Sequence, residues 1–277
     1  MLSLNNTLIR RAAKRYFYRY IKCLFYQNKV ANPILINSIP KSGTHLLDQC
    51  FVGFPHYADF GEFIASFPGY TKYPRQKHEI MRLLHRIRRN EIFRGHIFFS
   101  EMYSSFFEEN KFIHFFMIRD PRDLVVSEAY YLKYLAVYHK LHVYFKTLSM
   151  DDAIATSIQG IMLPNLHYPS FSDRILPYLG WLSKEYVNII RFEDLLSFNN
   201  STLLTLIDIV YPTYSRYNIS KDFLFTLLEY NLNNRKSHTF RKGGGKGSWR
   251  NAFSSHHLGL FDKYNNGVLE KLGYKFS

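Results

Sequence analysis

Residues 32–47, "NPILINSIPKSGTHLL", place a short apolar segment directly before a turn that contains a lysine, a serine, a glycine and a threonine. The segment 33–37 is typical of a buried strand, and the apolar pattern of residues 44–52 is typical of a helix. The first turn of a helix presents unpaired N–H groups and the positive end of the helix dipole. This strand–turn–helix unit, with Lys41 in the turn, therefore predicts a binding site for an anion.

The composition predicts a folded protein, large enough for an α/β domain, whose partners carry negative charge. The chain has 277 residues, 47% of them apolar, which is enough for one sizeable core. Its formal net charge of +14 is large and favours partners that carry negative charge. Two cysteines give no disulfide framework and suit a reducing compartment, so we expect a cytoplasmic location.

The N-terminal segment 1–30 is strongly basic. Residues 1–47 contain eight Lys or Arg and no Asp or Glu. Residues 8–26, "LIRRAAKRYFYRYIKCLFY", favour a helix whose apolar run is too short and too often interrupted by charge for a signal peptide or a membrane span. We expect a helical extension packed on the domain, with peripheral contact to anionic lipid as the alternative. The main folded domain is then expected over residues 31–277.

Strand and helix patterns alternate along the rest of the chain. Such an alternation predicts a single α/β domain with a central parallel sheet flanked by helices. Ligands of these sheets bind beyond the C-terminal ends of the strands, where Lys41, His96 and Arg119 are expected to converge. The expected strands are 33–37, 92–97, 111–118 and 186–192, and the expected helices are 44–52, 74–89, 121–145, 151–159, 171–183 and 194–209.

The turn around Lys41 lacks the features of a metal-dependent nucleoside-triphosphate site. A Walker A loop needs a glycine upstream of its Gly-Lys-Ser/Thr, and residues 37–40 read Asn-Ser-Ile-Pro instead. No acidic residue ends a later apolar strand in the Walker B manner. These absences disfavour a kinase-like site but not a phosphate site that works without Mg²⁺.

Two further segments predict phosphate contacts. Arg119 follows the expected strand 111–118 and precedes a helix that Asp120 and Pro121 can start. Ser127 lies about two turns along that helix. Arg119 and Ser127 could bind one phosphate, or Arg119 could pair structurally with a neighbouring aspartate. The glycine-rich, acid-free stretch 238–251, "HTFRKGGGKGSWRN", should order around an anion.

Together these segments carry a family resemblance. "IPKSGTHLL", "IRDPRDLVVSEAYY", "RFEDLL" and "RKGGGKGSWRN" resemble the sulfotransferases that use 3′-phosphoadenosine 5′-phosphosulfate (PAPS), in the family's order and over nearly the whole chain from residue 32. The resemblance implies the P-loop NTPase-like fold, PAPS as donor, and no metal. It implies catalytic roles for His96 and Lys41. The donor-binding residues carried over by position are Lys41, Ser42, Gly43, Thr44, His45, Arg119, Ser127, Phe192, Arg241, Lys242 and Gly243.

The resulting hypothesis is transfer of a sulfuryl group to a hydroxyl or amine. A neutral imidazole at His96 would accept the proton of the acceptor. His45 and Asp48 are the alternative bases. The acceptor could be a small molecule, a lipid or a saccharide, and no specific nucleic acid is expected. The alternative from another class is a non-catalytic binder of nucleic acid or an acidic polymer, which the basic, aromatic-rich composition would suit.

Overall fold

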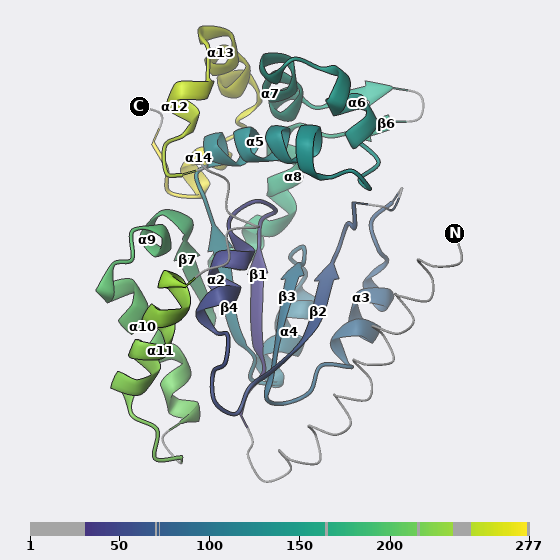
Figure 1. Ribbon diagram of the computed structural model, residues 1–277. Coiled ribbons are helices and arrows are strands. Elements are labelled where there is room, and N and C mark those ends of the chain that lie inside the picture. Colours follow the sequence, from purple (N-terminus) through teal and green to yellow (C-terminus); the bar gives the residue numbers. More distant parts are fainter. Residues whose placement is uncertain are drawn as a thin grey trace, which may run out of the picture.

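The sheet at the centre of the fold carries every element that reaches the predicted site. The computed structural model describes residues 31–69, 71, 73–163, 166–214, 217–234 and 245–275. Five parallel strands form one sheet in the order β2-β3-β1-β4-β7 (Figure 1). The predicted single α/β domain with a central parallel sheet is thereby confirmed. The strands are β1 Ile34–Ser38, β2 Ala58–Ala65, β3 Glu91–His96, β4 Ile113–Ile118 and β7 Val187–Arg191, and a separate antiparallel pair joins β5 Ile161–Leu163 to β6 Leu166–Tyr168.

Helices cover both faces of this sheet. Alternate strand residues pack to opposite sides, so Leu35 belongs to one buried cluster while Ile34 and Ile36 belong to the other. The first cluster packs under α3, α4, α5 and α7, and the second under α2, α10 and α11 (Figure 1). The helices are α2 Thr44–Cys50, α3 Lys77–Leu84, α4 Glu101–Glu109, α5 Pro121–Tyr130, α6 His142–Thr147, α7 Met150–Gln159, α8 Phe171–Ile175, α9 Phe192–Leu196, α10 Asn200–Val210, α11 Lys221–Asn233, α12 Trp249–Ala252, α13 Ser255–Tyr264 and α14 Val268–Lys271, with a π-helix at Tyr131–Leu135 and 3₁₀-helices at Leu176–Ser183 and Tyr211–Thr213.

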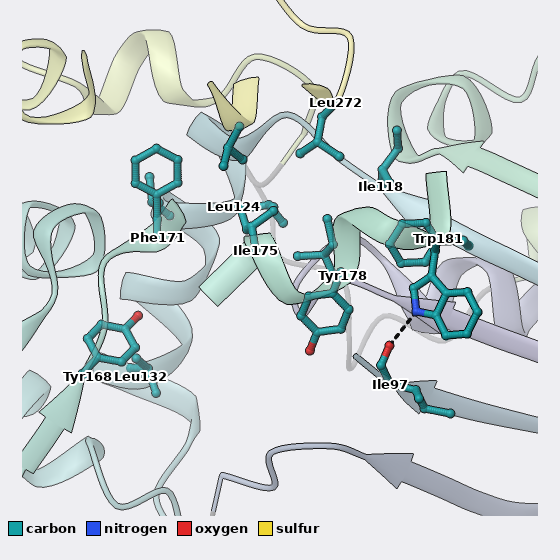
Figure 2. Packing of buried hydrophobic residues seen from close by; sticks show 14 of the residues in the cluster. Ile97, Ile118, Leu124, Leu132, Tyr168, Phe171, Ile175, Tyr178, Trp181 and Leu272 are labelled. Carbon is teal, nitrogen blue, oxygen red and sulfur yellow. Dashed lines mark hydrogen bonds between the residues drawn. The ribbon is translucent and has the colours of Figure 1, made fainter. Parts of the chain in front are cut away.

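A side chain ties the end of β1 to the residue after β3 at the edge where the predicted site lies. The side-chain amide of Asn37 donates to the carbonyl of Ile97 over 3.2 Å and accepts from the Ile97 N–H over 2.9 Å. The indole N–H of Trp181 donates to the same carbonyl over 2.9 Å, inside the first cluster (Figure 2). These bonds hold the end of β3, which carries His96, against the end of β1.

The four expected strands are present, whereas three expected helices are each divided. The helix expected over 121–145 ends as α5 and a short π-helix, and α6 follows after a turn. The helix expected over 171–183 becomes 3₁₀ from Leu176, where Pro177 removes a helical N–H. The helix expected over 194–209 divides into α9 and α10, and Asn199 caps α10. The basic segment 1–30 lies outside the described residues.

Candidate active site

Three turns meet at the C-terminal edge of the sheet, as the sequence predicts. Lys41 follows β1, His96 ends β3, and Arg119 follows β4. The Arg119 guanidinium donates from Nη1 to the carbonyl of Lys41 over 3.3 Å, which joins two of these turns directly. His96 is joined to the first turn through Ser38, the last residue of β1. The edge is thus one connected group of side chains drawn from distant parts of the sequence.

Lys41 is held in a conformation that presents its ammonium group at the site. Its backbone is left-handed, with φ 70°, a geometry uncommon outside glycine. The ammonium lies 3.8 Å from the ring centre of Tyr131, the first residue of the π-helix. Burial lowers the pKa of Lys41 to about 8, Glu128 opposes this decrease, and Arg119 adds to it. The Lys41 ammonium therefore loses its proton unusually easily, and an anionic ligand beside it would stabilise its charged form.

The rest of the first loop forms a tight cradle. Gly43 adopts φ 95° directly before α2, and a Cβ at this position would lie 2.5 Å from the ring of Phe192. No other residue fits there without displacing that ring. The hydroxyl of Ser42 is buried and has no hydrogen-bond partner among the described residues. A buried orphan hydroxyl beside Lys41 fits a ligand that accepts hydrogen bonds, such as a phosphate or a sulfate.

Arg119 is buried between the first loop, the glycine-rich loop and an aromatic ring. Besides its bond to Lys41, its Nη2 donates to the Gly245 carbonyl over 3.3 Å, and its guanidinium lies 4.2 Å from the ring centre of Phe192. Asp120 pairs instead with Arg122, over 2.8 Å, and caps α5. Burial lowers the pKa of Arg119, and the nearby acids oppose this decrease. Arg119 therefore lies where two ligand loops meet. Ser127 lies further along α5.

Asp123 anchors the glycine-rich loop to α5, a role that sequence reasoning missed. Its carboxylate accepts from the N–H of Gly247 over 2.8 Å, from the Ser248 hydroxyl over 2.9 Å and from the N–H of Trp249 over 2.9 Å. Trp249 is buried and stacks under the guanidinium of Arg122 at 4.1 Å. The end of this loop is therefore fixed to the helix that Arg119 precedes. The predicted ligand residues Arg241, Lys242 and Gly243 lie outside the described residues.

Replacing Asp123 with alanine should loosen this loop and destabilise the domain. The buried N–H of Trp249 and the part-buried N–H of Gly247 would lose their acceptor, and each unsatisfied buried group costs about 1–3 kcal/mol. We therefore expect a decrease in the free energy of unfolding of about 3 kcal/mol in urea titrations. Asp222→Ala, in the exposed first turn of α11, is the matched control and should change it by less than about 0.5 kcal/mol. Equal effects of the two substitutions would show that the anchor contributes nothing.

One ring nitrogen of His96 is engaged by the last residue of β1. Nδ1 lies 2.9 Å from the carbonyl oxygen of Ser38 and 3.1 Å from its hydroxyl. A carbonyl only accepts, so the neutral ring carries its proton on Nδ1 and leaves a lone pair on Nε2. No described residue donates to Nε2. The ring of Phe63 contacts His96 edge-on at 4.9 Å, and burial lowers the pKa of His96 to about 4, which keeps the ring neutral.

The two alternative bases lie in less suitable surroundings. No hydrogen bond among the described residues fixes the ring of His45, in the first turn of α2, and desolvation of that ring lowers its pKa. Asp48 is tied to Arg94 by an ion pair of 2.6 Å, and Arg94 also pairs with Asp59 at 2.9 Å. Burial raises the pKa of Asp48, and the Arg94 guanidinium opposes that increase. The ion pair occupies Oδ2 of Asp48 and favours the unprotonated carboxylate.

Glu193 is a second residue that the sequence reasoning did not single out. Its carboxylate accepts from the N–H of Asp120 over 3.0 Å and from the hydroxyl of Tyr274 over 2.8 Å. It thereby ties the start of α9 to the turn after β4 and to the C-terminal segment. The "RFEDLL" motif contained this signal, because an acid in the first turn of a helix commonly binds neighbouring N–H groups.

The turns at the edge of the sheet define the class of protein. Within the described ranges, no group of three or more His, Cys, Asp or Glu side chains is placed to hold a metal ion. No helix in that part of the chain is long and apolar enough to cross a bilayer. A parallel sheet whose strand-to-helix turn carries a lysine, faced by a buried arginine on the neighbouring turn, defines a P-loop-like protein that binds phosphate or sulfate groups.

Comparison with known proteins identifies the family. The sulfotransferase domain family matches residues 31–273, so the chain belongs to this family of PAPS-dependent sulfotransferases, as the four motifs predict. The fold is also similar to the crystal structure of mouse sulfotransferase SULT7A1 complexed with PAP. That similarity has a TM-score of 0.58 and 18% sequence identity, and covers 87% of this chain and 88% of that one. A search of curated protein sequences gave no match.

Proposed function

We propose that this sulfotransferase moves the sulfuryl group of PAPS to a hydroxyl or amine, with His96 as general base and Lys41 at the leaving phosphate. The observation that carries the proposal is the state of His96: its Nδ1 is held by the Ser38 carbonyl at 2.9 Å, so its Nε2 is left as a proton acceptor beside the Lys41 loop. By contrast, no hydrogen bond among the described residues fixes the ring of His45, and the Arg94 guanidinium beside Asp48 favours the unprotonated form of that carboxylate.

The proposed reaction is an in-line displacement at sulfur. The acceptor oxygen or nitrogen forms a bond to sulfur while the bond from sulfur to the donor's phosphate oxygen breaks. The acceptor proton passes to Nε2 of His96, and the electron pair of the broken bond leaves with adenosine 3′,5′-bisphosphate. Lys41 stabilises the negative charge that grows on that phosphate, and the buried surroundings strengthen this effect.

The geometry around Arg119 and Ser42 supports a donor with two separate anionic ends. Lys41, with the orphan hydroxyl of Ser42, suits the phosphosulfate end. Arg119 lies behind it, next to Gly245 of the glycine-rich loop, and suits the 3′-phosphate. The PAP in the mouse structure of similar fold adds support. Ser127, Phe192 and the Arg241–Gly243 stretch complete the proposed donor site.

Aromatic side chains beside the two reacting groups favour a ring-shaped or apolar acceptor. Phe63 contacts His96 and is 41% exposed, and Tyr131 contacts Lys41 and is 36% exposed. Exposed aromatic faces next to a base can hold an aromatic, sterol-like or sugar ring by stacking. We propose an acceptor of this kind, from among small molecules, lipids and saccharides.

The donor proposal predicts selective stabilisation by the bisphosphate. At about 100 times its Kd, adenosine 3′,5′-bisphosphate should stabilise the fold by about 2.7 kcal/mol, or about 5 °C in Tm. ATP with Mg²⁺ lacks the 3′-phosphate and should raise Tm far less at the same concentration. Differential scanning fluorimetry measures both, and 2′-deoxyadenosine 5′-phosphate serves as a control without a 3′-phosphate. Equal shifts with ATP and the bisphosphate would contradict the assigned 3′-phosphate site.

A further inference from the structure

Two buried hydroxyls connect the donor loop to the proposed base. The Ser38 Oγ lies 2.6 Å from Oγ1 of Thr44, the first residue of α2, and 3.1 Å from Nδ1 of His96. Ser38 is fully buried, and Thr44 is 5% exposed. The three side chains therefore form a continuous hydrogen-bonded chain that crosses from the loop after β1 to the end of β3.

One arrangement of the protons gives this chain a single direction. Because the Ser38 carbonyl fixes the proton on Nδ1 of His96, the Ser38 hydroxyl can only accept from that ring nitrogen. The bond between the two hydroxyls fits either donor, and a ligand oxygen that accepts from Thr44 leaves the Ser38 hydroxyl to donate to Thr44 Oγ1. Thr44 accepts that bond, and its own hydroxyl proton meets no acceptor among the described residues. The chain therefore ends in one O–H donor, located at the first turn of the helix that follows the Lys41 loop.

We propose that Ser38 and Thr44 are positioning residues that make His96 a stronger base when the donor is bound. This inference rests on the proposed function, because it takes the loop as the donor site and His96 as the base. An anionic donor oxygen that accepts from Thr44 polarises each bond behind it, and hydrogen bonds in a chain strengthen one another. The Ser38 hydroxyl oxygen then accepts a stronger hydrogen bond from Nδ1 of His96. The proton affinity of Nε2 rises as a result. The base is activated only when the nucleotide site is occupied.

The hydrogen-bonded chain from Thr44 through Ser38 to His96 is called the relay below. Ser38→Ala tests the relay without removing a proposed donor contact. The backbone carbonyl of Ser38 remains, so the Nδ1 proton stays in place and only the relay is broken. We expect turnover to fall at least tenfold while the Kd of adenosine 3′,5′-bisphosphate changes less than twofold. Ser104→Ala is the matched control, because it removes a buried hydroxyl that bonds to Tyr186 in another part of the fold. That control should keep full turnover.

A second readout separates the relay from a loss of packing. ¹⁵N-histidine NMR gives the pKa of His96 with and without the bisphosphate. The bound phosphates raise it by charge alone in every variant, and we expect the rise in Ser38→Ala to be at most half of that in the wild type. Thr44→Ser keeps a hydroxyl and should retain the full rise, whereas Thr44→Val should lose it to the same extent. If Ser38→Ala fails to fold, the comparison of Thr44→Ser with Thr44→Val tests the relay instead.

The outcomes are distinguishable. An undiminished rise in Ser38→Ala or Thr44→Val, or full turnover in Ser38→Ala, would overturn the relay while leaving the proposed function intact. Absence of bisphosphate binding to the wild-type protein would reject the donor assignment itself, and the relay with it. In Ser38→Ala, a reduced rise together with unchanged bisphosphate affinity supports the relay. Thr44→Val also loses its own contact to the nucleotide, so its rise is measured at saturating bisphosphate, and a reduced rise there supports the relay as well.

Discussion

His96→Ala is expected to lower turnover by about 10²–10⁴-fold, the usual contribution of a positioned general base. The affinity for adenosine 3′,5′-bisphosphate should hardly change, because His96 contacts Ser38 and Phe63 and neither proposed phosphate site. Turnover is measured with labelled donor and any acceptor that the wild type sulfates, and affinity by calorimetry. His167→Ala, on the exposed hairpin strand β6, is the control and should behave as the wild type.

The pH dependence of turnover checks the same assignment. Burial lowers the pKa of His96 from 6.5 to about 4 in the free protein, and the anionic donor should raise it. The neutral ring is the active form, so turnover should be constant at high pH and fall as the pH decreases through a midpoint above the free protein's value of about 4. A His96→Ala enzyme with near-full turnover would place the base elsewhere, and His45 and Asp48 would then be tested.

Lys41→Met should damage both donor binding and turnover, which separates its role from that of His96. Methionine keeps most of the stem that lies against Tyr131 and removes the charge. Losing one preorganised donor to a developing oxyanion costs about 10²–10³-fold in turnover. The Kd of the bisphosphate should rise as well, since one charge-assisted hydrogen bond is lost. Lys41→Arg, which keeps the charge, should retain most of the affinity.

The low pKa of Lys41 gives a second test with a definite sign. Only the protonated form attracts the phosphate, and in the free protein the pKa is about 8. Bisphosphate affinity should therefore be constant below that pH and decrease above it, by up to about tenfold per pH unit. The arginine variant stays protonated and should lose this dependence. A wild-type affinity that does not change between pH 7 and 10 would contradict the assignment of Lys41 to the phosphate.

The sequence predicted the parts of the fold that depend on local signals. The four expected strands are short apolar runs next to polar turns, and the turns after three of them carry Lys41, His96 and Arg119. Strand β2 was missed because Gly61 and two acids interrupt its apolar pattern, and its pairing with β3 shifts register between Asp59 and Phe63. Such a bulge destroys the period of two by which strands are recognised.

The division of the helix expected over 121–145 depends on tertiary contacts. The segment has no proline or glycine to interrupt it, but Leu132 and Phe145 are both buried in the same core cluster. Nδ1 of His142 lies 2.8 Å from the Leu132 carbonyl, and the Lys133 ammonium donates to the carbonyl of Leu148, so α6 folds back onto the end of the π-helix. No local propensity contains this information.

The site was predicted where a motif names a residue, and missed where a residue acts through others. Lys41 and Arg119 lie in recognisable turns, and the structure brings those turns into contact. Asp123, by contrast, looks like an ordinary acid in the first turn of a helix. Its partners are 124 to 126 residues away in the sequence, so only the folded chain reveals them.

The same separation bears on how the enzyme matures during synthesis. A growing chain has Lys41, His96 and Arg119 outside the ribosome long before Gly247, Ser248 and Trp249 are added, and Asp123 lacks those partners until then. Domains fold as units during translation. A prematurely terminated product would therefore contain the reacting residues without the anchored loop, and catalytic competence belongs to the completed polypeptide.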